Sequence, residues 1–180
     1  MNNVKLVVLL LAFSSYVHAA CNNAFDFNPK KLHSNEKINF CEAFSGKVLL
    51  VVNTASRCGF TPQFRELEAT YKQYREQGLE IVGFPSADFN QEYTEEEKIA
   101  EVCYMNYGVT FPMLAESSVR GPDTNPFFAW LSRESGHTPQ WNFNKYLIDT
   151  NGKVIRGYPS HVTPQNNEFR KTLLKALQKK

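Results

Sequence analysis

The chain lacks any concentrated run of basic residues. Its 20 Lys and Arg nearly balance its 18 Asp and Glu, which gives a formal net charge of +2 at pH 7. A nucleic-acid groove requires a basic stripe, so the sequence does not support this class of partner. A chain of 180 residues suits one domain, and a hydrophobic share of 42% argues against wholesale disorder.

Cysteine is also scarce. Four cysteines in 180 residues are too few for a disulfide-dense miniprotein, although they allow one bridge together with redox or metal chemistry. The histidines at positions 33, 137 and 161 are scattered along the chain. They give no short-range zinc spacing, so we expect no metal site.

The N-terminus carries an apolar run that is too short to span a bilayer. Lys5 precedes the eight apolar residues 6–13, and small side chains follow at Val17 and Ala19. This pattern predicts that residues 1–19 are a secretory signal, cleaved before Ala20 or one residue later. The mature protein would then be exported, without a stable membrane anchor. It would be periplasmic in a bacterium with two membranes and secreted otherwise.

The rest of the chain, residues 20–180, reads as a single domain that begins with a strand, a helix and a strand. The apolar run 47–53 is typical of a central strand that is covered on both faces. Thr61-Pro62 predicts the start of a helix that ends at Gly78. A second strand is expected at 79–84. A strand–helix–strand unit of this length predicts two parallel strands.

Four further patterns complete the expected fold. A capping box at 94–97 predicts a second helix, and Asn125-Pro126 predicts a third. Residues 146–149 and 154–158 flank a turn signal, which indicates a hairpin, and a last helix follows Pro164. This order predicts an α/β thioredoxin-like fold. Its central mixed β-sheet would be flanked by helices and preceded by a short N-terminal extension.

Cys58 is the residue with the most legible chemistry. It lies between a predicted buried strand and the N-terminus of a helix. Unpaired N–H groups and the helix dipole at such a place favour a thiolate, which is the nucleophilic form of cysteine. Arg57 either assists this charge or points to solvent. The alternative interpretation is that Cys58 is a small buried hydrophobic residue.

Several redox motifs are absent around Cys58. Thr61 and Pro62 stand where a C-x-x-C or C-x-x-x-C motif would place a second cysteine. Val51 and Ala55 stand where the peroxiredoxin pattern has Pro and Ser or Thr. These absences argue against a dithiol oxidoreductase, a copper-delivery relative and a peroxiredoxin of that pattern.

Four motifs occur in order along the chain. They are NTASRCGFT at 53–61, GFP at 83–85 with Gln91-Glu92, YGVTFPM at 107–113 and WNFNKYLID at 141–149. In this order and spacing the chain resembles the glutathione peroxidase family from about residue 47 to residue 175. The resemblance implies the catalytic residues Cys58, Gln91, Trp141 and Asn142. It also implies that the nucleophile is cysteine rather than selenocysteine.

The chemistry of these four residues is consistent with peroxide reduction. A thiolate attacks one peroxide oxygen, and the other oxygen leaves with developing negative charge. The indole of Trp141 and the amides of Gln91 and Asn142 are N–H donors that stabilise such charge. Without the resemblance, Trp141 would be read as a core aromatic and Asn142 as a turn residue.

The sequence departs from the family pattern after the second strand. Ser86 replaces the usual Cys, Asp88 replaces a Gln, and the segment that leads to Gln91 is one residue shorter. The shortening leaves the placement of Gln91 open. No basic cluster of the kind that holds glutathione in animal enzymes is evident.

Two cysteine roles follow from the remaining thiols. The resemblance implies that Cys103 is a resolving cysteine, which would condense with oxidised Cys58. The alternative is that Cys103 is simply buried on the apolar face of its helix. Cys21 and Cys41 both precede the core, and in an exported protein we expect them to form a structural disulfide.

The resemblance thus implies a thiol-dependent peroxidase that defends against oxidative stress. It would reduce hydrogen peroxide or organic hydroperoxides through a Cys58 sulfenic acid. No bound cofactor is expected, and glutathione or a thioredoxin-like protein would be the reducing co-substrate. Two alternatives are a peroxidase served only by thioredoxin-like partners, with Cys103 resolving, and a non-catalytic binding protein of thioredoxin fold.

Overall fold

A four-stranded mixed β-sheet forms the centre of the protein in a computed structural model that describes residues 25–178. The strand order is β2-β1-β3-β4. β1 (Val48–Thr54) pairs in parallel with β2 (Leu79–Pro85). On its other side β1 pairs antiparallel with β3 (Lys145–Ile148), which pairs antiparallel with β4 (Val154–Tyr158).

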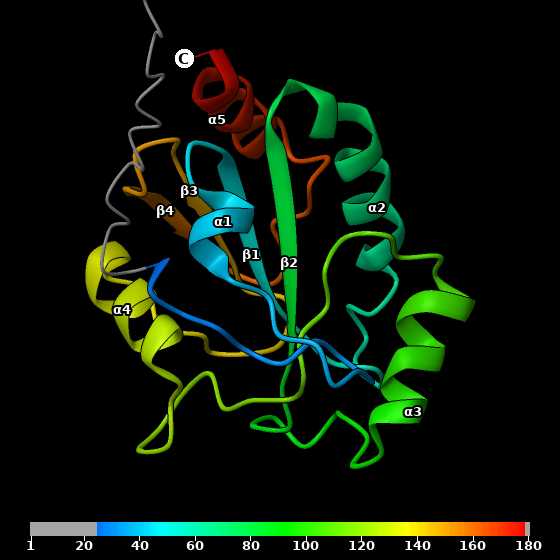
Figure 1. The fold of residues 1–180 in the computed structure, drawn as a ribbon. Helices are drawn as coiled ribbons and strands as arrows, with labels where there is room; N and C mark the ends of the chain where they lie inside the picture. Colours follow the sequence, from blue (N-terminus) through cyan, green and yellow to red (C-terminus); the bar gives the residue numbers. More distant parts are fainter. Residues whose placement is uncertain (1–24, 179–180) are drawn as a thin grey trace, which may run out of the picture.

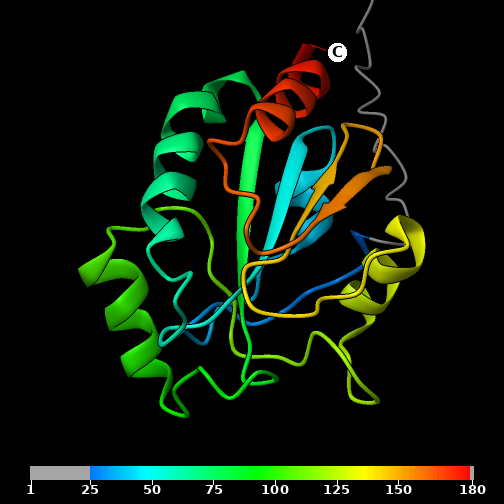
Figure 2. The ribbon, with the colours of Figure 1, turned by 180° about the vertical axis from the view of Figure 1, so that it is seen from behind.

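Helices cover both faces of this sheet, so that α2 and α4 lie on opposite sides of it (Figures 1 and 2). The first face carries α2 (Gln63–Tyr74) with the 3-10 turn η2 (Arg75–Gln77), α3 (Glu96–Ala100) with the π-helical segment η3 (Glu101–Asn106), and α5 (Asn167–Gln178). The second face carries α1 (Phe40–Phe44) and α4 (Pro126–Ser135).

All seven residues of β1 are buried, because the strand has helices on both of its faces. Leu50 and Val52 join the core under α2 and α5. Leu49 and Val51 point the other way and join the core under α1 and α4. This alternation is the two-residue period of a strand, and it explains why the segment reads as one continuous apolar run.

The predicted thioredoxin-like arrangement is confirmed. The first two strands are parallel and are joined through α2, and Gly78 ends the helical segment at φ 99°. Such a positive φ costs glycine little. β3 and β4 form the predicted hairpin, and the side chain of Asn125 caps α4 by accepting from the Phe128 N–H.

Two predicted helix caps are wrong. The Thr61 hydroxyl bonds within its own loop, and α2 begins two residues later at Gln63 without a side-chain cap. The Thr94 hydroxyl donates to the Glu95 carboxylate, so the expected capping box does not form and α3 begins at Glu96. In both places the hydroxyl bonds to another polar group instead of to a helix N–H.

Some predictions concern residues that the structure does not describe. The expected signal at 1–19, its cleavage site and Cys21 all lie outside residues 25–178. Of the helices between these limits, none combines the length and apolar character needed to traverse a bilayer. Within the same limits, no three His, Cys, Asp or Glu side chains are grouped closely enough to hold a metal ion.

Candidate active site

Three loops meet at the edge of the sheet where β1 and β2 end, at the lower end of the sheet in Figure 1. They are residues 55–62 after β1, 86–95 after β2 and 136–144 before β3. The Arg57 N–H donates to the Gln91 carbonyl at 2.9 Å and so joins the first loop to the second. Asn53, near the end of β1, donates through Nδ2 to the Trp141 carbonyl at 3.1 Å. The four predicted catalytic residues all lie in these loops.

Cys58 lies in the first loop, five residues before α2 begins. Its thiol is free, and the residue is only 7% exposed. The Phe60 N–H points at Sγ from 3.4 Å. The Thr61 hydroxyl accepts from the Cys58 N–H at 3.0 Å and lies within 2.9 Å of the Ala55 carbonyl, to which it can donate. The loop is therefore fixed on both sides of the sulfur, with one amide placed to stabilise negative charge there.

Gln91 and Asn142 come from different loops and are directly bonded. The Asn142 Nδ2 donates to the Gln91 Oε1 at 3.1 Å. Asn142 is fully buried, and within residues 25–178 its Oδ1 has no hydrogen-bond partner. A buried acceptor without a partner is unusual and marks a place where a ligand or substrate proton can bind. Gln91 thus lies within hydrogen-bond distance of Asn142 although the segment before it is one residue shorter.

Backbone strain flanks both amide residues. Asn90 has φ 56° and Phe143 has φ 61°, values that cost a residue with a side chain about 1–3 kcal/mol. Asn53 holds the second of these turns, because its carbonyl accepts from the Phe143 N–H and its Oδ1 accepts from the Asn144 N–H at 2.9 Å. Such strain persists only where the surroundings enforce it, and it concentrates at functional sites.

Trp141 lies at the surface of the same region. It is 41% exposed, and its ring centroid is 5.4 Å from that of Phe89, two residues before Gln91. Its carbonyl accepts from Asn53 and, at 2.7 Å, from the Asn144 Nδ2. The structure thus places the indole beside the loop that carries Gln91, with its backbone held from two sides.

The unusual segment before Gln91 has its own anchor. The Asp88 carboxylate accepts from the Ser118 hydroxyl at 2.9 Å and from the backbone N–H groups of Val119 and Arg120 at 2.6 and 3.1 Å. Ser86 is fully buried, and its hydroxyl accepts from the Asp88 N–H. Ser86 and Asp88 therefore both take part in contacts that hold the shorter segment in place.

Glu92 has a structural role that the sequence did not reveal. Its buried carboxylate accepts from the Ser56 and Tyr93 N–H groups at 3.0 and 2.9 Å. Its carbonyl accepts from Arg57 Nη2 at 3.1 Å, and the Arg57 guanidinium also lies over the Tyr93 ring. The exposed Arg57 side chain therefore ties two loops together through Glu92 and Tyr93. In the sequence, Glu92 is marked only by its place in the Gln91-Glu92 motif.

Cys103 is a free thiol in the π-helical segment η3. It is 1% exposed and belongs to the same apolar core as Cys58. Burial raises the pKa of its thiol to about 12, and the negative charge of Glu92 adds to this effect. Cys103 is therefore an uncharged, buried thiol in this structure, as its apolar helix face predicts.

Cys41 is disulfide-bonded in the structure. Its expected partner, Cys21, lies outside the described residues, so the Cys21–Cys41 pairing stays a prediction.

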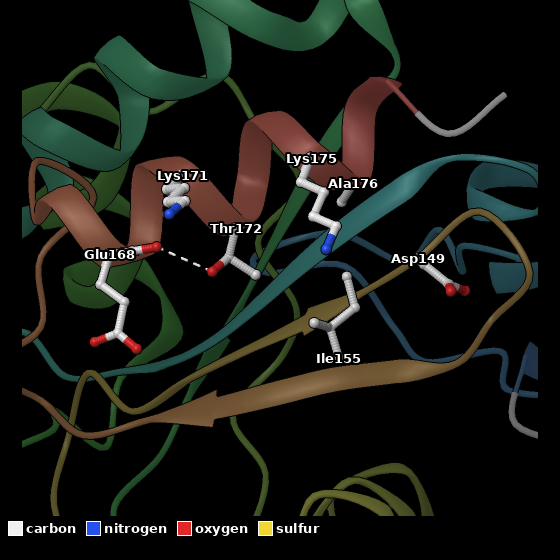
Figure 3. A pocket seen from close by; sticks show the side chains of 7 residues that line it. All are labelled: Asp149, Ile155, Glu168, Lys171, Thr172, Lys175 and Ala176. Atoms are coloured by element: carbon white, nitrogen blue, oxygen red, sulfur yellow. Dashed lines mark hydrogen bonds between the residues drawn. The ribbon is translucent and has the colours of Figure 1, made fainter.

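A separate groove of about 420 Å³ lies between α5 and β4 (Figure 3). It is lined by Asp149, Ile155, Glu168, Lys171, Thr172, Lys175 and Ala176. The dashed line in Figure 3 is a bond internal to α5, from the Thr172 hydroxyl to the Glu168 carbonyl. None of the lining residues comes from the three loops around Cys58, so the groove is not part of this site.

The profile described as glutathione peroxidase matches residues 24–132, which is more than half of the chain. The chain belongs to the glutathione peroxidase family. This membership makes the protein a peroxidase, as the sequence resemblance implied.

Individual relatives agree with this assignment. A glutathione peroxidase of Lactococcus lactis is 43% identical over 151 residues, which cover 81% of this chain and 95% of the relative. A glutathione peroxidase-like peroxiredoxin of Saccharomyces cerevisiae is 44% identical and covers 76% of this chain and 88% of its own length. The crystal structure of Trgpx in its apo form superposes with a TM-score of 0.69 at 30% identity, covering 88% of this chain and 98% of that one.

Proposed function

We propose that this glutathione peroxidase family member reduces hydroperoxides through a Cys58 sulfenic acid, with an external thiol as the final reductant. The substrates would be hydrogen peroxide or organic hydroperoxides. The nucleophile is a cysteine sulfur, so the reaction needs no selenium. No bound cofactor takes part in the proposed cycle.

The first step joins sulfur to oxygen. The Cys58 thiolate attacks one oxygen of the hydroperoxide, the O–O bond breaks, and the other oxygen leaves as hydroxide or alkoxide. That oxygen takes up a proton and departs as water or alcohol. The sulfur is oxidised to sulfenic acid, and the peroxide is reduced by the same two electrons.

The surrounding amides suit the charge that this step creates. The Phe60 N–H already points at the sulfur. Gln91, Asn142 and Trp141 supply neutral N–H donors around the place where the leaving oxygen becomes negative. The unpartnered Oδ1 of Asn142 offers an acceptor for the proton of the hydroperoxide before the O–O bond breaks. These groups would lower the barrier without a formal positive charge.

One observation carries the proposal. Gln91 and Asn142 are 51 residues apart in sequence, yet their side chains are bonded at 3.1 Å beside the loop of Cys58. Strained backbone at Asn90 and Phe143 accompanies each of them. Backbone strain clusters at functional sites, so this arrangement supports a catalytic role rather than a scaffold alone.

Stopped-flow measurement of Cys58 oxidation by hydrogen peroxide and by an organic hydroperoxide tests the proposal. Cys58→Ser should abolish the reaction, and Asn142→Ala should slow it by about 100-fold, as loss of a charge-stabilising amide does in comparable sites. Asn151→Ala, which alters an exposed turn residue between β3 and β4, is the matched control and should react at the wild-type rate. An Asn142→Ala protein as fast as the wild type would contradict the assigned role.

The reductant is a separate question, and we infer that a thioredoxin-like protein serves this peroxidase. Cys103 lies in the same core as Cys58, and opening of its helical segment would expose the thiol for the resolving step. Its thiol would attack the sulfur of the sulfenic acid, form a Cys58–Cys103 disulfide and release water. An external dithiol would then reduce this disulfide. The Saccharomyces cerevisiae relative is called a peroxiredoxin, which agrees with this route.

Turnover measured side by side with glutathione and with a thioredoxin system separates the two reductants. We expect the thioredoxin system to support turnover and Cys103→Ser to suppress it. Turnover with glutathione alone, unaffected by Cys103→Ser, would assign the other reductant.

We further propose that the enzyme works outside the cytoplasm. The charged start, apolar core and small residues of segment 1–19 support export, and a Cys21–Cys41 disulfide would form in an oxidising compartment. N-terminal sequencing of the protein recovered from the compartment to which it is exported would test the cleavage before Ala20.

A further inference from the structure

Lys145 is an unusual residue for the first position of β3, because its side chain is completely buried. Lysine is almost never fully buried without a partner. Here the Nζ donates to the Phe143 carbonyl at 2.8 Å and to the Ser160 carbonyl at 3.5 Å. Both partners are backbone oxygens, so the ammonium group holds two pieces of chain together.

The first of these pieces is the strained turn of the active site. Phe143 follows Asn142 directly and has the φ of 61° that sets the direction of the turn. A charged donor on its carbonyl fixes the orientation of that peptide group. Lys145 therefore acts on the segment that aims Trp141 and Asn142, although it contacts neither side chain.

The second piece connects the turn to α2. The Ser160 carbonyl also accepts from the Gln63 Nε2 at 2.7 Å, and Gln63 is the first residue of α2, five positions after Cys58. The Asn144 Nδ2 donates to the Ser160 hydroxyl at 3.1 Å. The buried ammonium thus lies where three segments come together: the turn that carries Asn142, the loop after β4 and the start of α2.

The charges around Lys145 are few. Glu66 of α2 is its electrostatic partner, and the Glu66 Oε2 is buried without a hydrogen bond within residues 25–178. The residues that β1 and α5 place in this core are apolar: Val48, Leu50, Val52, Phe169, Leu173, Ala176 and Leu177. Burial lowers the pKa of Lys145 to about 7, and the Glu66 charge opposes this change.

Two histidines lie near the same loops but on other sides of them. His161 follows Ser160 and is exposed. The His137 Nε2 lies 2.7 Å from the Asn144 Oδ1, and His137 is bonded through its carbonyl to Tyr146, which belongs to the core under α4. His137 can therefore influence the turn independently of Lys145, and the test has to distinguish the two.

We propose that Lys145 is a positioning residue whose protonated side chain locks the Trp141–Asn142 turn against the start of α2. The turn holds the geometry of the active site only while the side-chain amine of Lys145 is protonated. Loss of that proton weakens the donation to the Phe143 and Ser160 carbonyl oxygens. The effect on rate rests on the proposed role of Cys58, whereas the effect on the turn does not.

The effect on the turn can be observed without catalysis. In a Cys58→Ser, Trp130→Phe background, Trp141 is the one remaining tryptophan and no thiolate forms at position 58. We expect its fluorescence to change with pH in the neutral range. Lys145→Met should remove this transition. Glu66→Gln should move it to lower pH, because the Glu66 charge favours the protonated lysine.

The same variants, with Cys58 and Trp130 restored, then give the pH profile of Cys58 oxidation. The oxidation rate of the wild type should fall, by about tenfold per pH unit, once Lys145 loses its proton. Lys145→Met should remove the falling limb and lower the maximum rate by about 10- to 100-fold, as a displaced catalytic group does. Glu66→Gln should shift the falling limb to lower pH.

Lys47→Met is the matched control, since Lys47 pairs with Glu80 at the far end of the sheet and is 42% exposed. It should leave both the fluorescence and the rate profile unchanged. When His137→Gln is combined with Glu66→Gln, the fluorescence transition should still move to lower pH. A fluorescence transition that persists in Lys145→Met overturns the proposal, and so does one that does not move in Glu66→Gln. Glu66→Gln decides the question even if Lys145→Met does not fold. Absence of Cys58 oxidation in the wild type would instead reject the proposed function, and the fluorescence result would still decide the role of Lys145.

Discussion

Single side chains in this protein each hold more than one part of the site. Asn53 bonds the carbonyl of Trp141, the N–H of Phe143 and the N–H of Asn144, and thereby shapes the whole turn. Thr61 does the same for the loop of Cys58. Such residues are buried and make several hydrogen bonds each, so a substitution at one of them changes several contacts at once.

Glu92 allows a test at this scale that does not depend on activity. Burial raises its pKa above the ordinary 4.5, despite the N–H donors on its carboxylate, and Glu116 adds to the rise. Between 4.5 and the raised pKa the folded state holds more protons than the unfolded state. The contribution of Glu92 to stability is therefore complete below pH 4.5 and is lost as the pH rises through the raised pKa.

The change Glu92→Gln keeps an acceptor for the Ser56 and Tyr93 N–H groups but cannot ionise. We expect the free energy of unfolding of the wild type to decline relative to this variant as the pH rises from 4.5 toward neutral. Urea unfolding at a series of pH values measures the difference. Glu97→Gln, at an exposed position, is the control. If the free energy of unfolding depends on pH in the same way in the wild type and in Glu92→Gln, burial of the Glu92 carboxylate does not destabilise the protein.

Among the elements, the helix that carries Cys103 is the irregular one. α3 spans only five residues before it continues as the π-helical segment η3. π-helical turns are rare and are often found at functional sites. A disulfide needs Cα atoms within about 7 Å, and we propose that this segment unwinds when Cys103 pairs with Cys58. An irregular segment is easier to open than a regular helix with an optimal bonding pattern.

The proposed resolving role predicts an intramolecular Cys58–Cys103 disulfide in peroxide-treated protein. Non-reducing peptide mapping should find the two cysteine peptides joined, and circular dichroism should show a loss of helix that dithiothreitol restores. Cys103→Ser should retain its helix under the same treatment. Peptide mapping that finds only Cys58 oxidised would remove the resolving role.

At the scale of the whole molecule, local patterns predicted most of the architecture. The apolar run of β1, the Gly78 stop, the Asn125 cap and the hairpin turn each depend on neighbours in sequence, and each is confirmed. The caps at Thr61 and Thr94 were wrong because the two hydroxyls bond to polar groups outside the helices.

The active-site contacts could be predicted only in part. Motif resemblance indicated Cys58, Gln91, Trp141 and Asn142, and the structure brings the loops that carry them together. The supporting roles of Asn53 and Lys145 escaped the sequence analysis. Asn53 bonds residues about 90 positions away, and a lysine at the start of a strand gives no sign that it is buried. Such long-range contacts exist only once the sheet has formed.

The proposed peroxidase chemistry depends on Cys58 becoming a sulfenic acid, and this product can be trapped directly. Cys103→Ser protein, in which no resolving thiol consumes the product, is treated with one equivalent of hydrogen peroxide in the presence of dimedone and analysed by peptide mass spectrometry. We predict a dimedone adduct on the peptide that contains Cys58. A Cys58 that stays unmodified while the peroxide is left unreduced would contradict the central claim.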